Sequence, residues 1–326
     1  MSTSARSTPS SAPERIVVIY GGDSREAEVS KMTANGVANA IRASFPEVEM
    51  VAMDAKLIHA LQRLEPDVIY PAVHGSPGED GTLQGLLEML GMAYVGSGVV
   101  ASACGMDKLL AKRVFRAIGL TVPDDVAILD PSNTRRAAQE ALDQLGHEVA
   151  VKPATQGSAL GVTLVRGNED VQSAIDRAFE FDDRVLVERF VHGREITAGV
   201  LDLYGEKPAS LPVIEIVTPK GTWYDYQHRY TPGLSEHIVP AQLPKSVLAE
   251  IERVACEAHA ILGCRELSRA DFIVDSDNRV YLLEVNTLPG MTPTSLYPDA
   301  ASAAGLSFEE LMRRLVTSAW QRAHAA

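Results

Sequence analysis

Two apolar runs near the C-terminus, each carrying acidic or amide side chains, constrain this chain more than any other stretch. Asp271 lies in the first run, and Glu284 and Asn286 lie two residues apart in the second, VYLLEVN. Both runs are typical of β-strands, in which side chains alternate between faces, so Glu284 and Asn286 point to the same side. We therefore expect two neighbouring strands that present two carboxylates and an amide carbonyl. Mg²⁺ prefers such an all-oxygen set, particularly beside nucleotide phosphates.

A purely structural interpretation of these residues is also available. Glu284 would then be a surface acid on an edge strand, and Asn286 would begin a turn. A carboxylate inside the run LLEVN is costly to bury without a partner, and this cost favours the metal site.

The first part of the chain has the order of a parallel α/β sheet. Apolar runs at 15–22, 48–54 and 68–75 alternate with helix-like segments, the first at about 29–43. A β-α-β-α-β order predicts parallel strands whose carboxyl ends carry ligand-facing loops. The glycines after the first run lack the Gly-x-Gly-x-x-Gly spacing of nicotinamide-binding dehydrogenases, so we set that class aside.

The pattern of runs divides the chain into a tail and three units. Residues 1–14 are rich in Ser and Pro and are expected to be a disordered tail. Residues 15–107 form the α/β unit, 108–192 form a compact α+β unit, and 193–326 carry the candidate metal strands. The last unit contains a long polar and aromatic segment at 222–236, which we expect to close over the site as a lid loop.

Charge and cysteine content exclude several classes of protein. The net charge is −13, so the chain lacks the basic field of a nucleic-acid binder. Its apolar runs are too short to cross a bilayer. Cys104, Cys256 and Cys264 are widely spaced and fit neither a disulfide framework nor a zinc site. We therefore expect a protein of the reducing cytoplasm, with no nucleic-acid or membrane partner.

A lysine followed by a small, flexible loop marks a second candidate site. Lys152 ends an apolar run, and Gly157 and Ser158 follow it in KPATQGSALGV. Such a loop lets backbone N–H groups approach phosphates while the lysine supplies charge. A hairpin turn is the alternative, because no Gly-Lys-Ser/Thr follows. Further along, Glu188 and Glu195 could hold a ribose or an amino group, or could be solvated loop acids.

Six segments extend from Gly21 to Leu296, nearly the whole chain, and they are GGDSREAEVS, HGSPGEDGTLQG, KPATQGSALGV, YDYQHRYTPG, SRADF and LLEVNTLPGMTPTSL. In this order and at compatible spacing, they resemble the motifs of D-alanine–D-alanine ligases, which belong to the ATP-grasp superfamily. The resemblance implies an α/β and α+β architecture, in which an N-terminal Rossmann-like domain precedes two ATP-grasp subdomains. It implies that two D-alanines are joined through an acyl phosphate for peptidoglycan precursor synthesis. It also implies a homodimer that uses ATP and Mg²⁺, with two metal ions and with Mn²⁺ as a substitute.

The resemblance assigns roles to individual residues. It implies that Mg²⁺ is held by Asp271, Glu284 and Asn286, the same three that the strand argument selects. The residues that it places against ATP are Lys108, Lys152, Glu188, Arg189, Val191, Glu195, Trp223, Arg229 and Leu283. The residues that it places against the amino-acid substrates or the reacting carbonyl are Glu28, His74, Ser158, Tyr230, Arg269, Gly290, Ser295 and Leu296.

Within the substrate set, each residue has an implied function. Glu28 pairs with the ammonium of the first D-alanine, and Ser158 and Tyr230 link that acid to the lid. Arg269 and the N–H of Gly290 stabilise the tetrahedral intermediate. The carboxylate of the second substrate is held by the last two residues of the set, Ser295 and Leu296. From the residues alone, Glu28 could instead be a first-turn helix acid, His74 a packed strand-end histidine and Tyr230 a loop residue over apolar surface.

Some positions depart from the commonest family pattern. Arg229 stands where a lysine usually precedes the loop tyrosine, and Gln156 and Gln227 stand where acids are common. Arginine keeps the positive charge but presents it as a planar fork. Two other functions therefore stay open: a ligase of a different carboxylate and amine, and a nucleotide-binding protein without catalysis.

Overall fold

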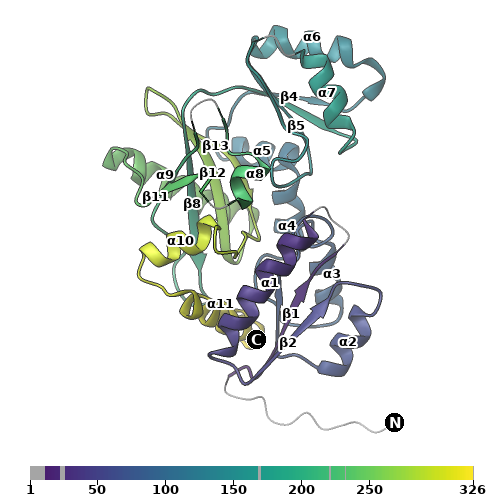
Figure 1. Ribbon diagram of the computed structural model, residues 1–326, viewed down its shortest axis with the longest axis vertical. Coiled ribbons are helices and arrows are strands. Elements are labelled where there is room, and N and C mark those ends of the chain that lie inside the picture. The colour runs from purple at the N-terminus through teal and green to yellow at the C-terminus, as the bar shows by residue number, and fades with distance from the viewer. Residues whose placement is uncertain (1–11, 23–25, 168–169, 220–221, 232, 326) are drawn as a thin grey trace.

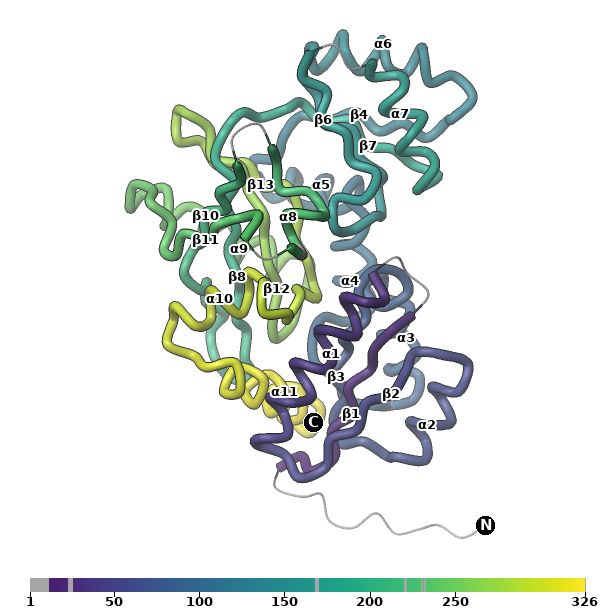
Figure 2. Tube along the Cα trace, viewed as in Figure 1, coloured from purple at the N-terminus to yellow at the C-terminus, as the bar shows by residue number. Residues whose placement is uncertain are grey.

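Three sheets are arranged along an elongated body in the computed structural model of the protein (Figures 1 and 2). The structure describes residues 12–22, 26–167, 170–219, 222–231 and 233–325. Most of the expected N-terminal tail therefore lies outside the described residues. None of the helices in these ranges is long and apolar enough to cross a membrane.

The N-terminal sheet is parallel, with strand order β2-β1-β3, which confirms the β-α-β-α-β prediction. Its strands are β1 (Arg15–Tyr20), β2 (Glu47–Ala52) and β3 (Val68–Pro71). The helices of this region are α1 (Ala27–Arg42), α2 (Leu57–Leu64), α3 (Thr82–Met89) and α4 (Val99–Met106). The four inner residues of β1 are fully buried because helices cover both faces of the sheet.

The middle sheet is antiparallel, with strand order β4-β7-β5-β6, and lies at the top of Figure 1. Its strands are β4 (Asp125–Ile128), β5 (Val149–Pro153), β6 (Thr163–Val165) and β7 (Val185–Arg189). A short 3-10 turn, Pro131–Asn133, leads into α6 (Thr134–Leu145), which packs with α7 (Val171–Phe179) on one face of this sheet. Helix α5 (Lys108–Ala117) precedes β4 in the chain, and its residues Ala111 and Phe115 belong to the core of the C-terminal sheet.

The C-terminal sheet has strand order β11-β10-β8-β12-β13, with β9 paired to β8, and is antiparallel throughout. Its strands are β8 (Arg194–Asp202), β9 (Ala209–Ser210), β10 (Ile214–Val217), β11 (Glu236–Ile238), β12 (Glu266–Val274) and β13 (Val280–Asn286). Its helices are α8 (Tyr226–Tyr230), α9 (Lys245–Leu262), α10 (Leu296–Ala303) and α11 (Phe308–His324). The two predicted metal strands are neighbours, because β12 pairs with β13.

The segment expected to be a lid loop contains a helix. Asp225 caps α8 by accepting a hydrogen bond from the backbone N–H of His228 at 3.0 Å, and its carboxylate also contacts the His228 ring at 2.6 Å. A short polar side chain at the N-cap satisfies a backbone donor that the first helical turn leaves unpaired. Part of the segment is therefore ordered locally by its own cap.

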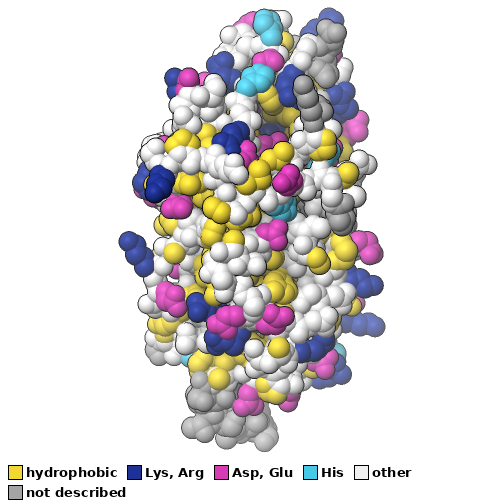
Figure 3. Space-filling view, turned by 60° about the vertical axis from the view of Figure 1, so that its left-hand side comes forward, with side chains coloured by type: hydrophobic (Ala, Val, Ile, Leu, Met, Phe, Trp, Pro, Cys, Tyr) yellow, Lys and Arg dark blue, Asp and Glu magenta, His cyan; other side chains and the backbone are white. Residues whose placement is uncertain are grey.

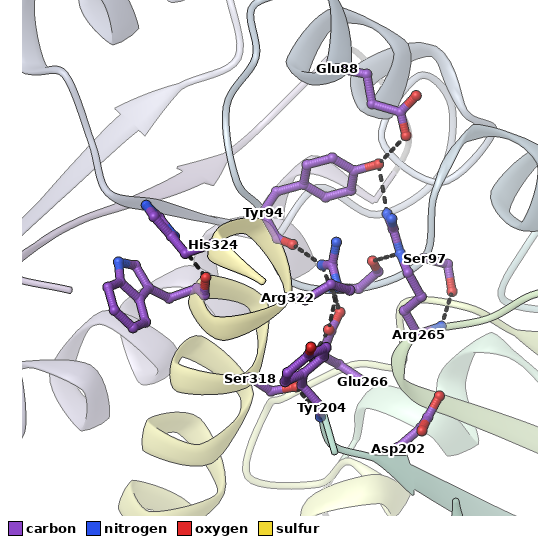
Figure 4. A network of polar contacts seen from close by, with 12 residues as sticks. Glu88, Tyr94, Ser97, Asp202, Tyr204, Arg265, Glu266, Ser318, Arg322 and His324 are labelled. Atoms are coloured by element: carbon purple, nitrogen blue, oxygen red, sulfur yellow. Dashed lines mark hydrogen bonds and ion pairs between the residues drawn. The ribbon is translucent and has the colours of Figure 1, made fainter. Parts of the chain in front are cut away.

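A buried polar network fastens the N-terminal sheet to the C-terminal sheet (Figure 4). Glu266, at the start of β12 and 1% exposed, accepts hydrogen bonds from the backbone N–H of Gly96 and from Arg322 on α11, both at 2.9 Å. Arg322 also donates to the backbone carbonyl of Tyr94, and Arg265 donates to the Tyr94 hydroxyl, both at 2.8 Å. The chain that follows β3 is thus held against the strand that carries Arg269 and Asp271.

Candidate active site

Two cavities meet between the sheets. The larger has a volume of about 420 Å³ and lies between the middle and C-terminal sheets, with Lys152 and Glu188 on one side and Glu195 and Asp271 on the other. The smaller has a volume of about 100 Å³ and is closed on one side by the N-terminal residues Glu26, His74 and Glu79. Their shared wall is made of Lys108, Gly157, Ser158, Tyr224, Arg229 and Glu284. Ligands in the two cavities would therefore contact each other along this wall.

Every residue that the resemblance places against ATP lines the larger cavity. These residues are Lys108, Lys152, Glu188, Arg189, Val191, Glu195, Trp223, Arg229 and Leu283. They come from the middle sheet and the chain after it, from α5, from β8 and β13, from the segment before α8, and from α8 itself. In Figure 3, basic and acidic side chains are interspersed on the face shown, and they form no basic patch there.

Glu188 is the most constrained acid of the larger cavity. It is 2% exposed and contacts the ammonium groups of both Lys112 and Lys152. Burial alone would raise the pKa of Glu188, but the two lysines outweigh it and lower this pKa to about 2. Burial likewise lowers the pKa of Lys152, but Glu188 reverses the shift and raises it above its ordinary value. Both groups are therefore charged at neutral pH.

Arg229 faces the shared wall with an unsatisfied donor. Its guanidinium lies over the ring of Tyr224, 4.6 Å from the ring centroid. Its Nε is buried and has no hydrogen-bond acceptor among the described residues. A buried charged N–H without an acceptor is costly, so this atom fits an anionic oxygen that a ligand would bring.

The three candidate metal ligands lie at the junction of the cavities. The strand register places Asp271 opposite Glu284, and Asn286 opposite Arg269. The Arg269 guanidinium contacts both oxygens of Asp271, at 2.9 and 2.8 Å, and Lys108 lies 3.4 Å from Glu284. Burial opposes ionisation of both acids, but Arg269 and Lys108 respectively outweigh it and lower the pKa values of Asp271 and Glu284. Both carboxylates are therefore available as charged oxygen donors.

This donor set fits a hard cation that also binds phosphate. No group of three or more His, Cys, Asp or Glu side chains in the described ranges could hold a metal by itself. Two carboxylates and one amide oxygen would leave the remaining positions of a Mg²⁺ ion to phosphate oxygens and water, as is usual for this ion in nucleotide sites. The oxygen-only chemistry also excludes a preference for softer metals.

The smaller cavity contains the residues expected around the reacting carbonyl. Arg269, Gly290, Ser295 and Leu296 line it together with His74. A Cβ at Gly290 would lie 3.0 Å from the Ser295 hydroxyl, so any other residue there would have to displace this hydroxyl slightly. The Ser295 hydroxyl accepts a hydrogen bond from the backbone N–H of Thr292 at 2.9 Å, and this bond fixes the turn before α10.

His74 is buried among polar partners on the N-terminal side of the smaller cavity. Its Nε2 lies 3.0 Å from the Thr33 hydroxyl, and its Nδ1 lies 3.8 Å from Glu79. Burial lowers the pKa of His74, but its interaction with Glu79 outweighs burial and raises this pKa above the ordinary value. His74 lines the smaller cavity as well as packing at the end of a strand, so the purely structural interpretation of this residue does not describe it fully.

The structure does not bring Glu28 into either cavity, and the acid that it places there at the start of α1 is Glu26. Glu28 is exposed and lines neither cavity, whereas Glu26 is 5% exposed, lines the smaller cavity and accepts a hydrogen bond from Ser158. Residues two apart on a helix point in nearly opposite directions, so only one of the two acids can face the cavity. The buried Ser30 and Thr33 mark the inward face of α1, and Glu26 stands four residues before Ser30 on that face.

Ser158 lies where it was expected, in a strained loop. Ser158 and Ala159 have φ angles of 48° and 58°, in the left-handed region that non-glycine residues seldom adopt. Such strain persists where surrounding contacts enforce it, and it is concentrated at functional sites. The Tyr230 side chain, expected to join Ser158 and the acid, lies outside the described part of the structure.

Two side chains of the site were not anticipated from the sequence. Lys112 lies in an amphipathic stretch that is typical of a surface helix, yet it is 1% exposed and contacts Glu188. Glu79 was included in a glycine-rich loop without a role, and it contacts His74 and accepts a hydrogen bond from the backbone N–H of Gly75 at 2.6 Å. The one sequence signal for these two side chains is a charged residue within a segment of otherwise small or apolar residues.

Comparison with known proteins agrees with this arrangement. Residues 114–317 match the family described as D-ala D-ala ligase C-terminus, and residues 54–97 match D-ala D-ala ligase N-terminus. A D-alanine–D-alanine ligase of Desulforamulus reducens is 44% identical over 313 residues, which cover 94% of this chain and 99% of that protein. A D-alanine–D-alanine ligase of Halalkalibacterium halodurans is 43% identical over 304 residues, covering 93% of this chain and 98% of the relative.

Solved structures show the same architecture. The D-alanine–D-alanine ligase of Bacillus anthracis, crystallised with ATP, has a TM-score of 0.82 and 30% identity, and the match covers 96% of this chain and 99% of that one. The ligase of Coxiella burnetii has a TM-score of 0.80 and 28% identity, over 96% and 95% of the two chains. The fold is therefore the ATP-grasp fold expected from the sequence, and the chain belongs to the D-alanine–D-alanine ligase family.

Proposed function

We propose that this protein joins two D-alanine molecules into D-alanyl-D-alanine, consuming ATP, for peptidoglycan precursor synthesis. The observation that carries the proposal is the wall shared by the two cavities. It brings the phosphate-directed cations Lys108 and Arg229 to the same place as Glu284 and Ser158. A nucleotide in the larger cavity and an amino acid in the smaller one would meet at this wall.

In the first step, the carboxylate of the first D-alanine attacks the γ-phosphorus of ATP, and ADP leaves. Phosphoryl transfer needs positioning and neutralisation of charge, which Lys152, Lys108 and Arg229 supply. Their positions around the larger cavity support this role. The product is an acyl phosphate, which is a far better electrophile than a carboxylate. Glu26, rather than Glu28, would hold the ammonium of this D-alanine, because its buried carboxylate faces the smaller cavity.

In the second step, the amine of the second D-alanine attacks the acyl carbon, phosphate leaves and a peptide bond forms. The carbonyl oxygen becomes negative in the transition state. Arg269 and the N–H of Gly290 would stabilise it, and a well-aimed donor of this kind contributes about 3 kcal/mol. Ser295 and Leu296 would hold the carboxylate of the second substrate, and their place beside Gly290 supports this assignment.

Asp271, Glu284 and Asn286 would hold Mg²⁺, as two ions in our proposal, or Mn²⁺ in its place. Bound there, the metal would supply positive charge to the nucleotide phosphates. The contact between Arg269 and Asp271 supports an arrangement in which one carboxylate serves both the metal and the oxyanion residue.

Three broader expectations also remain proposals. These are domain boundaries after residues 107 and 192, a homodimer, and a location in the cytoplasm. Light scattering on the purified protein tests the dimer directly, because the mass of one chain is 35.1 kDa.

The function is tested by phosphate release from ATP and Mg²⁺ with D-alanine, with L-alanine, and with D-alanine plus D-lactate, the products being identified by mass. We expect no release with L-alanine, release in both reactions that contain D-alanine, and in each of these a product of the mass of the dipeptide and none of the mass of the D-lactate ester. Release that requires a different amine or carboxylate would refute D-alanine as both substrates. Nucleotide binding without turnover of any pair would refute the ligase assignment.

A further inference from the structure

Lys112 belongs to a line of alternating charges that runs from the surface to the larger cavity. The line begins at Arg116, which is 40% exposed and contacts Asp125. Lys112 lies 3.6 Å from Asp125 and contacts Glu188, and Glu188 contacts Lys152 in the cavity wall. Lys112 itself lines neither cavity. It therefore acts on any ligand only through Glu188.

The two lysines divide the carboxylate of Glu188 between them. Lys112 contacts Oε1 and Lys152 contacts Oε2. The backbone of Glu188 is fixed independently, because it pairs with Asp125 of β4 on one side and with Ala150 of β5 on the other. The two lysines therefore decide the charge balance and the orientation of the carboxylate, and they do not hold the strand.

We propose that Lys112 is a positioning residue for the nucleotide, which neutralises Glu188 permanently so that Lys152 can serve a phosphate. This inference rests on the proposed function, because it takes the ligand of the larger cavity to be ATP. Without Lys112, one ammonium would have to serve both the buried Glu188 and the phosphates. The nearby Asp125 would then repel Glu188 instead of sharing a cation with it.

The burial of these groups makes the competition severe. Lys112 is 1% exposed and Glu188 is 2% exposed, so solvent would screen little of the charge of Glu188 if Lys112 were removed. The charge of Glu188 is maintained by both lysines, which together lower its pKa to about 2. A buried carboxylate that loses one cation binds the remaining one more tightly. Lys152 would consequently be less available to phosphate in a Lys112 variant.

The test compares ligands with and without phosphates. We would measure the affinities of ATP and adenosine by calorimetry in the presence of Mg²⁺, for the wild type and for Lys112→Met, Lys112→Gln and Lys112→Arg. We expect the neutral variants to bind ATP about tenfold more weakly and adenosine within about twofold of the wild type. Lys112→Arg should recover most of the ATP affinity, because it restores the charge at the same place.

A double-mutant comparison separates charge sharing from a general structural effect. In a Glu188→Gln background there is no carboxylate to neutralise, so Lys112→Met should no longer change the ratio of ATP to adenosine affinity. Equal losses of ATP and adenosine affinity in Lys112→Met and Lys112→Gln would overturn the inference, as would a lower Tm with an unchanged ratio. Failure of the wild type to bind ATP would instead overturn the proposed function, together with this inference.

Discussion

Two acids at the start of α1 have opposite environments, although one residue separates them. Glu26 is buried in the smaller cavity beside Ser158, and Glu28 is exposed. We predict that Glu26→Gln raises the KM for the first D-alanine at least tenfold, because the ammonium loses a charged partner in a poorly hydrated site. Initial rates of phosphate release over a range of D-alanine concentrations measure the effect.

The matched control is Glu28→Gln, which removes the same charge from the same helical turn. Its KM should remain within about twofold of the wild type, since an exposed charge contributes little. Equal effects of the two substitutions would mean that the net charge near α1, and not the buried carboxylate, governs substrate binding.

Strand periodicity explains which site residues could be predicted and which could not. Alternation along one strand places Glu284 and Asn286 on the same side, and this could be predicted from the sequence. The strand register, which sets Asp271 opposite Glu284, has no signal within either apolar run. Lys112 was missed because its burial is created by β4 and β7, which lie outside its own helix. Glu26 was missed because the face of α1 that points inward includes polar residues, and the sequence does not show which of these are buried.

Among the elements, α8 depends most on a single side chain. It has only five residues, Asp225 caps it, and it carries Arg229 into the wall between the cavities. Loss of an N-cap side chain typically costs about 1 kcal/mol. We predict that Asp225→Ala lowers kcat/KM for ATP about fivefold with little change in Tm, because α8 contributes little to the core. Steady-state kinetics and a thermal melt measure the two quantities.

Asp225→Asn is the control for α8, because it removes the charge and keeps an acceptor for the backbone N–H of His228. It should retain most of the activity if the cap is what matters. A loss as large as that of Asp225→Ala would point to the contact between the carboxylate and the His228 ring instead.

The middle sheet should show a pH-dependent stability that originates in β7. The pKa of Glu188 is lowered from 4.5 to about 2 by Lys112 and Lys152. A carboxyl group whose pKa is lower in the folded than in the unfolded protein stabilises the fold. This stabilisation is complete at pH values above the pKa of the unfolded state, and it is lost as the pH falls through the pKa of the folded state. We predict that the stability deficit of Glu188→Gln relative to the wild type is full above about pH 4.5 and shrinks toward pH 2. Urea unfolding of both proteins at several pH values tests this; a deficit independent of pH would contradict it.

Some elements lacked a sequence signal. Helices α4 and α10 are short, rich in alanine and other small residues, and without a clear alternation of apolar and polar residues. The three strands of the parallel sheet were predictable as apolar runs, and the long helix α9 was predictable because its apolar residues recur with the helical period. Asp225 is a typical N-cap residue and could have indicated the start of α8, but the surrounding segment is so polar that we expected a loop.

At the scale of the whole molecule, the network around Glu266 sets how the N-terminal sheet faces the C-terminal one. The smaller cavity includes N-terminal residues, whereas the larger cavity includes none before Lys108. We predict that Arg322→Met, which removes the cationic partner of Glu266, raises the KM for D-alanine about tenfold and leaves ATP affinity within about twofold. A displacement of about 1 Å between reacting groups can reduce rates strongly. The nucleotide cavity contains no residue of the N-terminal sheet, so ATP binding should not depend on how the two sheets face each other.

Arg313→Met on the same helix provides the control, because Arg313 is 46% exposed and pairs with Glu310 only one turn away. It should match the wild type in both constants. If Arg322→Met weakened ATP and D-alanine equally, the network would serve general stability and not the orientation of the sheets.

The separate composition of the two cavities has a consequence for inhibitors. A compound confined to the larger cavity meets no residue before Lys108, so the N-terminal sheet cannot contribute to its selectivity. A compound that extends past Ser158 and Arg229 reaches Glu26 and His74 and would bridge all three sheets. Such a compound would hold the sheets together, and its affinity would therefore report on their relative orientation as well as on the occupied site.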